Sequence, residues 1–285
     1  MKLILKNTES VANERLSITK KEIPCLDSSW HYHAQYELLY ISKSYGIRFV
    51  GDNVSHFFPG DLVLVGPYLP HLWRNDLSYY NEDDVNKVNT IIIKFTKDFI
   101  GVDTFNNPEF AEINDLLELA KYGVYFGNIV SDKIHDELVN ILDLTPAQQS
   151  IKILDILSRL SMTKDKQVLS SSDMRQYTTE GSQRIDDVIK YVSDNYTSYI
   201  SLNDVADIAC MTSNSFCRFF KKATNKSFTQ FLNEVRIRNA SRMLAQEDLP
   251  ISEVCYVVGY KSITNFNRQF KRIMGTTPNG FKQTL

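Results

Sequence analysis

The chain has 285 residues, of which 43% are hydrophobic and 23% charged, and no apolar stretch approaches the length that crosses a membrane. This length leaves room for two domains with ordinary cores. The net charge of −2 conceals a division, because residues 183–285 carry 14 Lys and Arg against 9 Asp and Glu, a net charge of +5, which leaves −7 for the first 182 residues. A basic half beside an acidic half is typical of a nucleic-acid-binding module joined to another domain.

The cysteines and the N-terminus bear on the cellular compartment. The four cysteines are widely spaced and form no C-x-x-C pair. They are Cys25, Cys210, Cys217 and Cys255. This spacing favours reduced thiols, and the first residues contain no apolar signal-peptide core. We therefore expect a cytoplasmic protein with no membrane partner.

Residues 1–105 have the pattern of short β-strands. The predicted strands are residues 36–41, 46–50, 61–65 and 90–95. Turn signals separate them, such as Gly51-Asp52-Asn53 and Pro59-Gly60-Asp61. Many short strands with regular turns predict a barrel or a jelly roll.

Several side chains of this part could serve a binding site. His31, His33 and Glu37 are all at odd positions, so on a strand they would point to one face. Arg48 and Trp73 add a cation and an aromatic face, which suit recognition of a small molecule. Ordinary barrel packing is the competing interpretation of each.

Helical periodicity replaces strand periodicity after Pro108. Three apolar stripes predict helices within residues 106–164. The stripes are Phe110, Ile113, Leu116, Leu117 and Ala120; Ile134, Leu138, Ile141 and Leu142; and Ile151, Leu154, Ile156, Leu157 and Leu160. These helices could cap the barrel or form a contact between two subunits. Residues 165–182 are polar and lack apolar periodicity, which indicates an interdomain linker.

Residues 183–285 contain one helical unit twice. After a helix at 183–196, a short amphipathic helix, a turn and a second helix are predicted at 201–223 and again at 250–274, about 49 to 50 positions later. A long helix between them would begin at a capping box formed by Ser227 and Gln230. Ser262 is the expected N-cap of the last long helix. Two helical hairpins without a DNA role would explain the apolar stripes but not the matching basic faces.

The C-terminal part resembles the DNA-binding domain of the AraC family of bacterial transcription regulators. The resemblance rests on Leu202-Asn-Asp-Val-Ala206, Arg218-Phe-Phe-Lys-Lys222, Arg236-Ile-Arg-Asn-Ala240, Ile251 to Tyr260, Phe266-Asn-Arg-Gln-Phe-Lys271 and Thr277-Pro278. It implies that the second helix of each unit reads DNA. The residues expected at the DNA are Ser213, Asn214, Cys217, Arg218, Lys221 and Lys222 on the first helix, and Ile263, Thr264, Asn267, Arg268 and Lys271 on the second.

The N-terminal part resembles the cupin barrel that many AraC-like proteins carry as a sensor. This resemblance rests on residues 31–37, on Phe58-Pro-Gly-Asp61 and on Leu69-Pro-His71. It implies a small-molecule pocket lined by His31, His33, Glu37, Arg48, His71 and Trp73. Cupins that bind metal use a His-x-His-x-x-x-Glu set with a later histidine, which His31, His33, Glu37 and His71 match. The spacing of the glycines after Glu37 is looser than in that motif, so we expect a metal-free pocket, with a divalent metal as the alternative.

The expected architecture is a two-domain α+β protein with a cupin-like barrel and an all-α domain. We expect it to be a sequence-specific regulator, an activator, that binds promoter DNA and RNA polymerase and responds to a sugar or a similar polar effector. The family also implies a homodimer formed through residues 106–164. The alternatives are a metal sensor and a cupin enzyme, an oxygenase or isomerase. No separate catalytic constellation accompanies the histidines, so no enzyme is expected.

Overall fold

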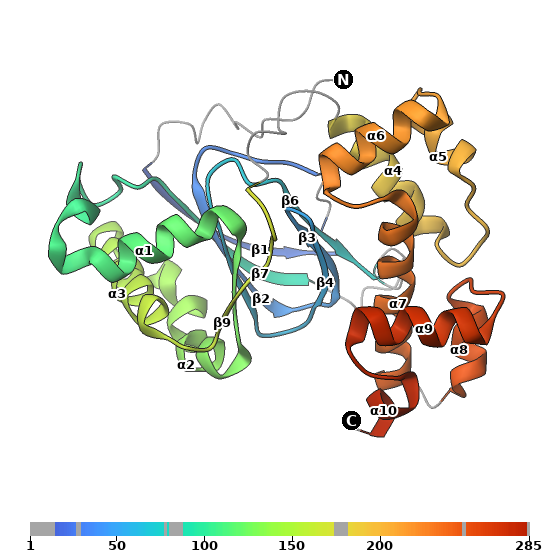
Figure 1. The fold of residues 1–285 in the computed structure, drawn as a ribbon. Coiled ribbons are helices and arrows are strands. Elements are labelled where there is room, and N and C mark those ends of the chain that lie inside the picture. The colour runs from blue at the N-terminus through green and yellow to red at the C-terminus, as the bar shows by residue number, and fades with distance from the viewer. Residues whose placement is uncertain are drawn as a thin grey trace. The chain divides into compact units, whose positions relative to one another are not determined.

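The computed structural model describes residues 15–26, 30–76, 79, 88–173, 182–246 and 249–283. It divides into two compact units, Met1–Glu180 and Gly181–Leu285. The first is rich in β-sheet and the second is helical (Figure 1). No helix in the described ranges has both the length and the apolar character needed to cross a membrane.

The described residues of the N-terminal unit form two antiparallel sheets (Figure 1). One has six strands in the order β1-β7-β2-β5-β8-β9, and the other has three in the order β4-β3-β6. The bounds are β1 Leu16–Ile23, β2 Tyr36–Lys43, β3 Gly46–Val50, β4 Asn53–Phe57, β5 Asp61–Val65, β6 His71–Asn75, β7 Val88–Phe95, β8 Val124–Phe126 and β9 Lys166–Val168. The predicted strands at 46–50 and 61–65 coincide with β3 and β5, and β1, β4, β6, β8 and β9 add to the prediction.

The central strands β2 and β5 of the six-stranded sheet are buried on both faces. In β2, Leu39 lies opposite Val63 of β5 and Ile92 of β7, and these side chains join a core that also holds Val50 and Trp73 of the small sheet. Alternate residues of the same strands, such as Leu38, belong to a second core formed with the helices. Burial on both faces explains why β5 carries four consecutive apolar residues, Leu62 to Val65, rather than an alternating pattern.

Three helices cover the outer face of the large sheet (Figure 1). They are α1 Ala111–Leu119, α2 Asn128–Val139 and α3 Pro146–Met162. Short 3₁₀ turns at Thr104–Asn106, Pro108–Phe110, Ala120–Tyr122 and Ile141–Asp143 flank them. The predicted stripes are confirmed at most positions, but Leu142 and Ile151 are exposed by 43% and 68%. Ile153 is buried in place of Ile151, because the inward face of α3 starts two residues later than the stripe predicted.

Two short strands lie where sequence reasoning placed none. β8 lies among the helices of residues 106–164 and pairs with β5, and β9 pairs with β8 inside the segment 165–182 that was expected to be a linker. The linker prediction was therefore too long at its N-terminal end. Residues 174–181 of that segment lie outside the described residues.

The C-terminal unit consists of helices around two aromatic cores. Its helices are α4 Ser182–Asn195, α5 Leu202–Ile208, α6 Ser213–Thr224, α7 Phe228–Gln246, α8 Ile251–Val257, α9 Ile263–Met274 and α10 Pro278–Gln283. The pair α5 and α6 lies at one end of α7 and the pair α8 and α9 at the other (Figure 1). Both predicted caps are confirmed, since Ser227 and Gln230 bond each other's backbone N–H and Ser262 caps α9.

Candidate functional site

Helices α6 and α9 have the same two-faced construction. Phe216 and Phe220 of α6 are fully buried, and so are Phe266 and Phe270, which stand 50 positions later on α9. Burial of two aromatic rings on one side fixes which side of each helix faces solvent. The opposite faces are therefore presented outward in both pairs.

The outward face of α6 carries five of the six residues of this helix that were predicted to meet DNA. Asn214, Cys217 and Arg218 are exposed, as are Lys221 and Lys222 in the last turn. Ser213 is half-buried, and its hydroxyl donates a hydrogen bond of 2.6 Å to Asn203 Oδ1 of α5. This bond ties the start of α6 to the preceding helix, so Ser213 contributes to the pair's geometry as well as to its surface.

The outward face of α9 repeats this arrangement. Thr264, Asn267, Arg268 and Lys271 are exposed. Arg268 Nη2 donates a hydrogen bond of 2.9 Å to Asn265 Oδ1, which orients the guanidinium along the helix. Ile263 is half-buried and packs against the core of the second pair, so only part of its side chain is open to solvent.

One exposed cation of α9, Arg272, was not among the residues predicted to meet DNA. Arg272 stands 50 positions after Lys222 and is exposed in the last turn of the helix. The repeat offset that relates Arg218 to Arg268 also relates Lys222 to Arg272, so the signal was present in the sequence. Each long helix thus ends in two adjacent cations.

The turns inside the two pairs share a hydrogen-bond pattern. Met211 N–H donates to Ala206 O at 2.9 Å, and Tyr260 N–H donates to Cys255 O at 3.1 Å. Such a bond across the end of a helix needs a residue in the left-handed region, which is Cys210 with φ 53° in the first turn and Gly259 with φ 87° in the second. Because the two turns have the same hydrogen bond and a left-handed residue at the same place, α6 follows α5 in the same way as α9 follows α8.

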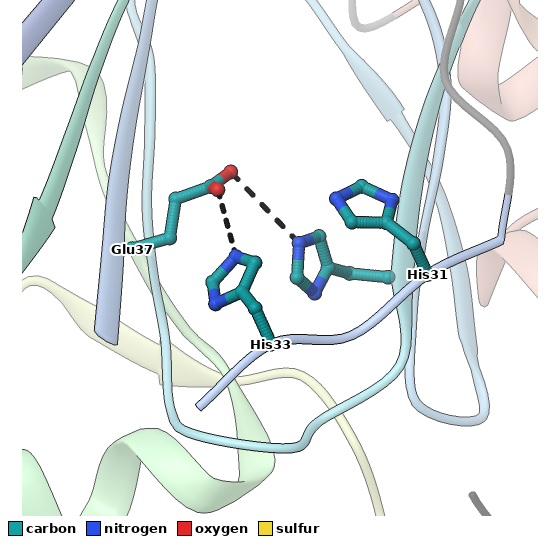
Figure 2. A group of neighbouring side chains, drawn as sticks. His31, His33 and Glu37 are labelled. Carbon is teal, nitrogen blue, oxygen red and sulfur yellow. Dashed lines mark hydrogen bonds and ion pairs between the residues drawn. The ribbon is translucent and has the colours of Figure 1, made fainter. Parts of the chain in front are cut away.

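A second candidate site lies within the N-terminal unit. His31, His33, Glu37 and His71 are buried, and each offers one ligand atom within 4.8 Å of the others. Figure 2 shows the labelled side chains of His31, His33 and Glu37 pointing toward a common centre. The four predicted residues are therefore brought together, although His31, His33 and Glu37 do not share one strand.

The backbone explains how these residues meet. Only Glu37 lies on β2, since this strand begins at Tyr36, and His31 and His33 precede it. His31 forms an isolated antiparallel bridge with His71, the first residue of β6. The bridge holds His31 against the small sheet, and His33 lies between this bridge and the start of β2.

Backbone carbonyls orient two of the imidazoles. His33 Nδ1 lies 2.9 Å from Gln35 O and His71 Nδ1 lies 2.8 Å from Leu69 O, and a carbonyl can only accept. The Nε2 atoms consequently face Glu37, at 2.9 Å from His33 and 3.9 Å from His71. His71 Nε2 has no hydrogen-bond partner within the described part of the chain. Metal-binding histidines commonly have their second nitrogen fixed in this way.

A lysine of β7 balances the negative charge of Glu37. Lys94 Nζ lies 3.2 Å from Glu37 Oε2. Burial opposes ionisation of Glu37, but the hydrogen bond from His33, the nearby imidazoles of His71 and His33 and the Lys94 ammonium hold the pKa of this carboxyl well below its usual range. Burial and the adjacent His31 ring lower the pKa of His71 well below its ordinary value. The cluster thus offers a carboxylate and an uncharged imidazole at His71.

The other two predicted pocket residues, Arg48 and Trp73, are also buried. Arg48 of β3 is opposite Trp73 of β6, and the Trp73 ring centre lies 5.8 Å from that of His71. The Arg48 guanidinium pairs with buried Asp61 and lies 4.6 Å from the centre of the Tyr125 ring. Asp61 and Tyr125 were not predicted, since only the strand register brings β5 and β8 to Arg48. A polar pair in an apolar core is a feature of small-molecule sites.

Comparison with known proteins bears on the C-terminal unit. A family model described as a helix-turn-helix domain matches residues 205–284. An uncharacterised HTH-type transcriptional regulator of Bacillus subtilis, YdeC, is 25% identical over 53% of this chain and 52% of its own length. The Msm operon regulatory protein of Streptococcus mutans is 22% identical over 54% of this chain and 57% of its own.

Among solved structures, the C-terminal domain of AraT, a response regulator from Geobacillus stearothermophilus, is 26% identical, with a TM-score of 0.36. The alignment covers 38% of this chain and 89% of that domain. The chain spans about half the length of the two curated relatives. From the matched domain and the regulators that share it, we conclude that the C-terminal unit contains an AraC-type helix-turn-helix domain.

Proposed function

We propose that this chain is a transcription regulator that binds double-stranded promoter DNA with α6 and α9 in successive segments of the major groove. The observation that carries the proposal is the repeated face of Asn, Arg and Lys side chains on two helices whose other faces are buried. Such side chains bond base edges and phosphates, whereas a helix that served only the core would need no matching polar face.

The chemistry of these side chains suggests their roles. Arg218 and Arg268 can bond guanine O6 and N7 together, and Asn214 and Asn267 can address adenine in the same way. Thr264 and Ser213 suit either base or phosphate, and Ile263 offers only its exposed edge to a thymine methyl. Cys217 is short for a base contact, so we assign it the smallest share of specificity.

The cations at the helix ends would meet phosphates. Lys221, Lys222, Lys271 and Arg272 are exposed in the last turns of α6 and α9. Their contribution to affinity would depend on salt and carry little sequence information. Helix α7 has 19 residues, a length of about 28 Å, and the two pairs lie near its ends. This separation is comparable to one turn of B-DNA, about 34 Å.

The N-terminal unit would then act as the sensor. We propose that it is a cupin-like barrel whose inner core binds a small polar effector, such as a sugar, beside His71, Trp73 and Arg48. The polar side chains enclosed by the two sheets support this role, because an enclosed apolar wall with a few polar groups selects small molecules. Effector binding would regulate transcription, in our proposal as an activator contacting RNA polymerase, by favouring one arrangement of the protein.

The DNA-binding proposal can be tested by selecting genomic fragments of the source organism that the purified full-length protein retains. The expected result is a motif with two short elements separated by about one helical turn. A double variant, Arg218→Ala with Arg268→Ala, is the matched control and should enrich no motif while keeping its fold by circular dichroism. Failure of the wild-type protein to enrich any sequence, with and without candidate effectors, would contradict the proposal.

A metal-sensing regulator is the second candidate. The observation that favours it is the pair of Nδ1 contacts to backbone carbonyls, which direct two Nε2 atoms toward Glu37. Three imidazoles and a carboxylate suit a first-row divalent cation such as Zn²⁺ or Mn²⁺. His31, His33, Glu37 and His71 would hold the ion, which would supply a point of attachment for an anionic effector. The Lys94 ammonium opposes cation binding because it already neutralises Glu37.

Metal content should be measured on protein purified without chelator and without an affinity metal. One equivalent of metal in the wild-type protein and none in His71→Ala would support the site, and metal-dependent DNA affinity would identify a sensor. Lys94→Met should bind added Zn²⁺ more tightly, since it removes the competing ammonium. If the wild-type protein contains no metal and the Lys94→Met variant does not bind added Zn²⁺, the metal site is excluded. If metal-loaded protein turns over a substrate, the cupin enzyme is favoured over the sensor.

A further inference from the structure

The segment between α4 and α5 lies against the turn of the second helix pair. Helix α4 packs with α5 and α6, yet Tyr196 at its end packs against the core formed by α7, α8 and α9. Residues 196–200 therefore leave the first pair, contact the second and return to Leu202, where α5 begins. We call this segment the bridging loop.

A close backbone approach brings the bridging loop to the second turn. A Cβ atom added at Gly259 would lie 2.7 Å from the carbonyl oxygens of both Tyr196 and Thr197. Side-chain carbons essentially never come this near to backbone atoms, so only glycine allows the contact. The loop and the turn therefore touch through their backbones, which gives them little freedom to slide.

One guanidinium holds this junction together. Arg236 of α7 donates from Nε to Tyr196 O at 2.8 Å and from Nη2 to Ser198 O at 2.7 Å. Its centre lies 5.7 Å from the middle of the Tyr260 ring. Arg236 thus contacts the bridging loop and the second turn from the helix that connects the pairs. The planar fork of arginine allows two such bonds at once, which a lysine ammonium cannot reproduce with the same geometry.

Tyr260 is itself fixed to α7. It is buried, and its hydroxyl donates a hydrogen bond of 2.6 Å to Asn233 Oδ1. Ser262, the N-cap of α9, follows only two residues later. The direction of α9 therefore depends on Tyr260, while the direction of α5 depends on the bridging loop, and Arg236 contacts both.

From this junction we infer that Arg236 is a positioning residue that holds α6 and α9 at a fixed spacing and phase for a two-element DNA site. The inference rests on the proposed function and adds to it a determinant of spacing specificity. Arg236 is half-buried with its donors on protein carbonyls, so it acts through the helices and not through a DNA contact of its own. A DNA site with two elements is bound more tightly than one element alone only if α6 and α9 can contact both elements at the same time.

The test compares full-length wild-type protein with Arg236→Met, Arg236→Lys and Arg184→Met. Arg184→Met removes one exposed cation of α4 and controls for the loss of charge. The probes are selected two-element DNA, the same DNA with 5 base pairs inserted between its elements, and DNA with one element alone. Gel-shift titration gives the affinities, and circular dichroism with thermal unfolding checks the fold.

We expect the insertion to weaken wild-type binding by about tenfold or more and binding of Arg236→Met by about twofold. Affinity for single-element DNA should be equal in both, and Arg236→Lys should lie between them. A wild-type dependence on spacing that persists unchanged in Arg236→Met overturns the inference. If Arg236→Met does not unfold cooperatively, the comparison uses Arg236→Lys instead. An insertion that weakens binding of Arg236→Lys as much as that of the wild-type protein also overturns the inference. Wild-type protein indifferent to the insertion overturns the proposed two-element function as well, and the wild-type measurements alone reveal this.

Discussion

The carboxylate of Asp52 accepts a hydrogen bond of 2.8 Å from the backbone N–H of Ser171, a residue 119 positions later in the chain. It also accepts from the hydroxyls of Ser170 and Ser171. Asp52 lies in the turn between β3 and β4, and Ser171 follows β9. One carboxylate of the small sheet therefore holds the last described segment of the N-terminal unit, at residues 169–173.

Removal of this carboxylate should destabilise the N-terminal unit. Asp52→Ala removes the acceptor of the Ser171 N–H and hydroxyl and one of two acceptors of the buried Ser170 hydroxyl, which costs about 1 to 3 kcal/mol in free energy of unfolding. Urea denaturation of full-length protein would measure the loss. Asp115→Ala, which removes an exposed carboxylate of α1, is the control and should change stability by less than about 0.5 kcal/mol. Equal losses in the two variants would mean that Asp52 does not hold the segment.

Base-reading and phosphate-binding side chains should respond differently to truncation. Arg268→Ala should cost about 1 to 3 kcal/mol of binding free energy on the selected motif and relax the preference at one base pair. Lys222→Ala should weaken binding to every sequence alike and reduce the salt dependence by about one phosphate contact. Competition titrations at two salt concentrations separate these effects. An equal loss on selected and scrambled DNA for Arg268→Ala would refute its role at a base edge.

The C-terminal helices could be predicted because their signals are local. The apolar residues of α6 and α9 recur at helical spacing, and the caps at Ser227 and Ser262 involve residues only three positions apart. The repeat offset reinforced each weak signal by showing it twice. What periodicity could not reveal is the bridging loop, because Arg236 bonds a residue 40 positions away.

The N-terminal unit was harder to predict because its contacts are distant in sequence. Tyr125 of β8 pairs with Val63 and with Gln167, so two strands of three residues each are defined only by their neighbours. Parity grouped His31, His33 and Glu37, and the cupin resemblance added His71. The four side chains do converge, but the cause is different. The bridge between His31 and His71, not a strand through His33, brings the imidazoles together.

In protein freed of divalent metal by a chelator, the stability of the N-terminal unit should fall as the pH drops below about 6.5. Burial lowers the pKa of His71 below its ordinary 6.5, so between the two values the unfolded chain binds more protons than the folded one. Stability therefore rises with pH in this window. The pKa of Glu37 is also lowered from its ordinary 4.5, so protonation of Glu37 causes a further loss of stability as the pH falls below 4.5.

Denaturation midpoints measured at pH 8, 7, 6 and 5 would follow this effect, about 1.4 kcal/mol for each pKa unit by which His71 is lowered. His71→Gln is the control, because it retains a polar side chain without the titration. Its stability should depend less on pH between 7 and 5 than that of the wild-type protein. Identical slopes in the two proteins would show that His71 is not held uncharged.

The exposed strip of α3 offers a test of the predicted homodimer. Ile151 and Met162 are exposed by 68% and 74%, and a separation of 11 residues places them on one side of the helix. If α3 forms the subunit contact, sedimentation equilibrium of the wild-type protein should give a dimer at micromolar concentration. Ile151→Lys with Met162→Lys should shift it toward monomer, whereas Lys121→Glu, a charge change outside α3, should not. A monomeric wild-type protein would exclude this contact.

The two left-handed turn residues should differ in their tolerance of substitution. Gly259→Ala should destabilise the C-terminal unit by about 2 kcal/mol or more, because an L residue is strained at φ 87° and its Cβ would meet the carbonyls of Tyr196 and Thr197. Cys210, at φ 53° in the first turn, already bears the strain of a side chain. Cys210→Gly should leave stability unchanged or raise it by about 0.5 kcal/mol, since relief of this strain exceeds the extra freedom of glycine in the unfolded chain. Thermal unfolding of the two variants measures both effects. A Gly259→Ala variant as stable as the wild-type protein would mean that the bridging loop does not press against the second turn.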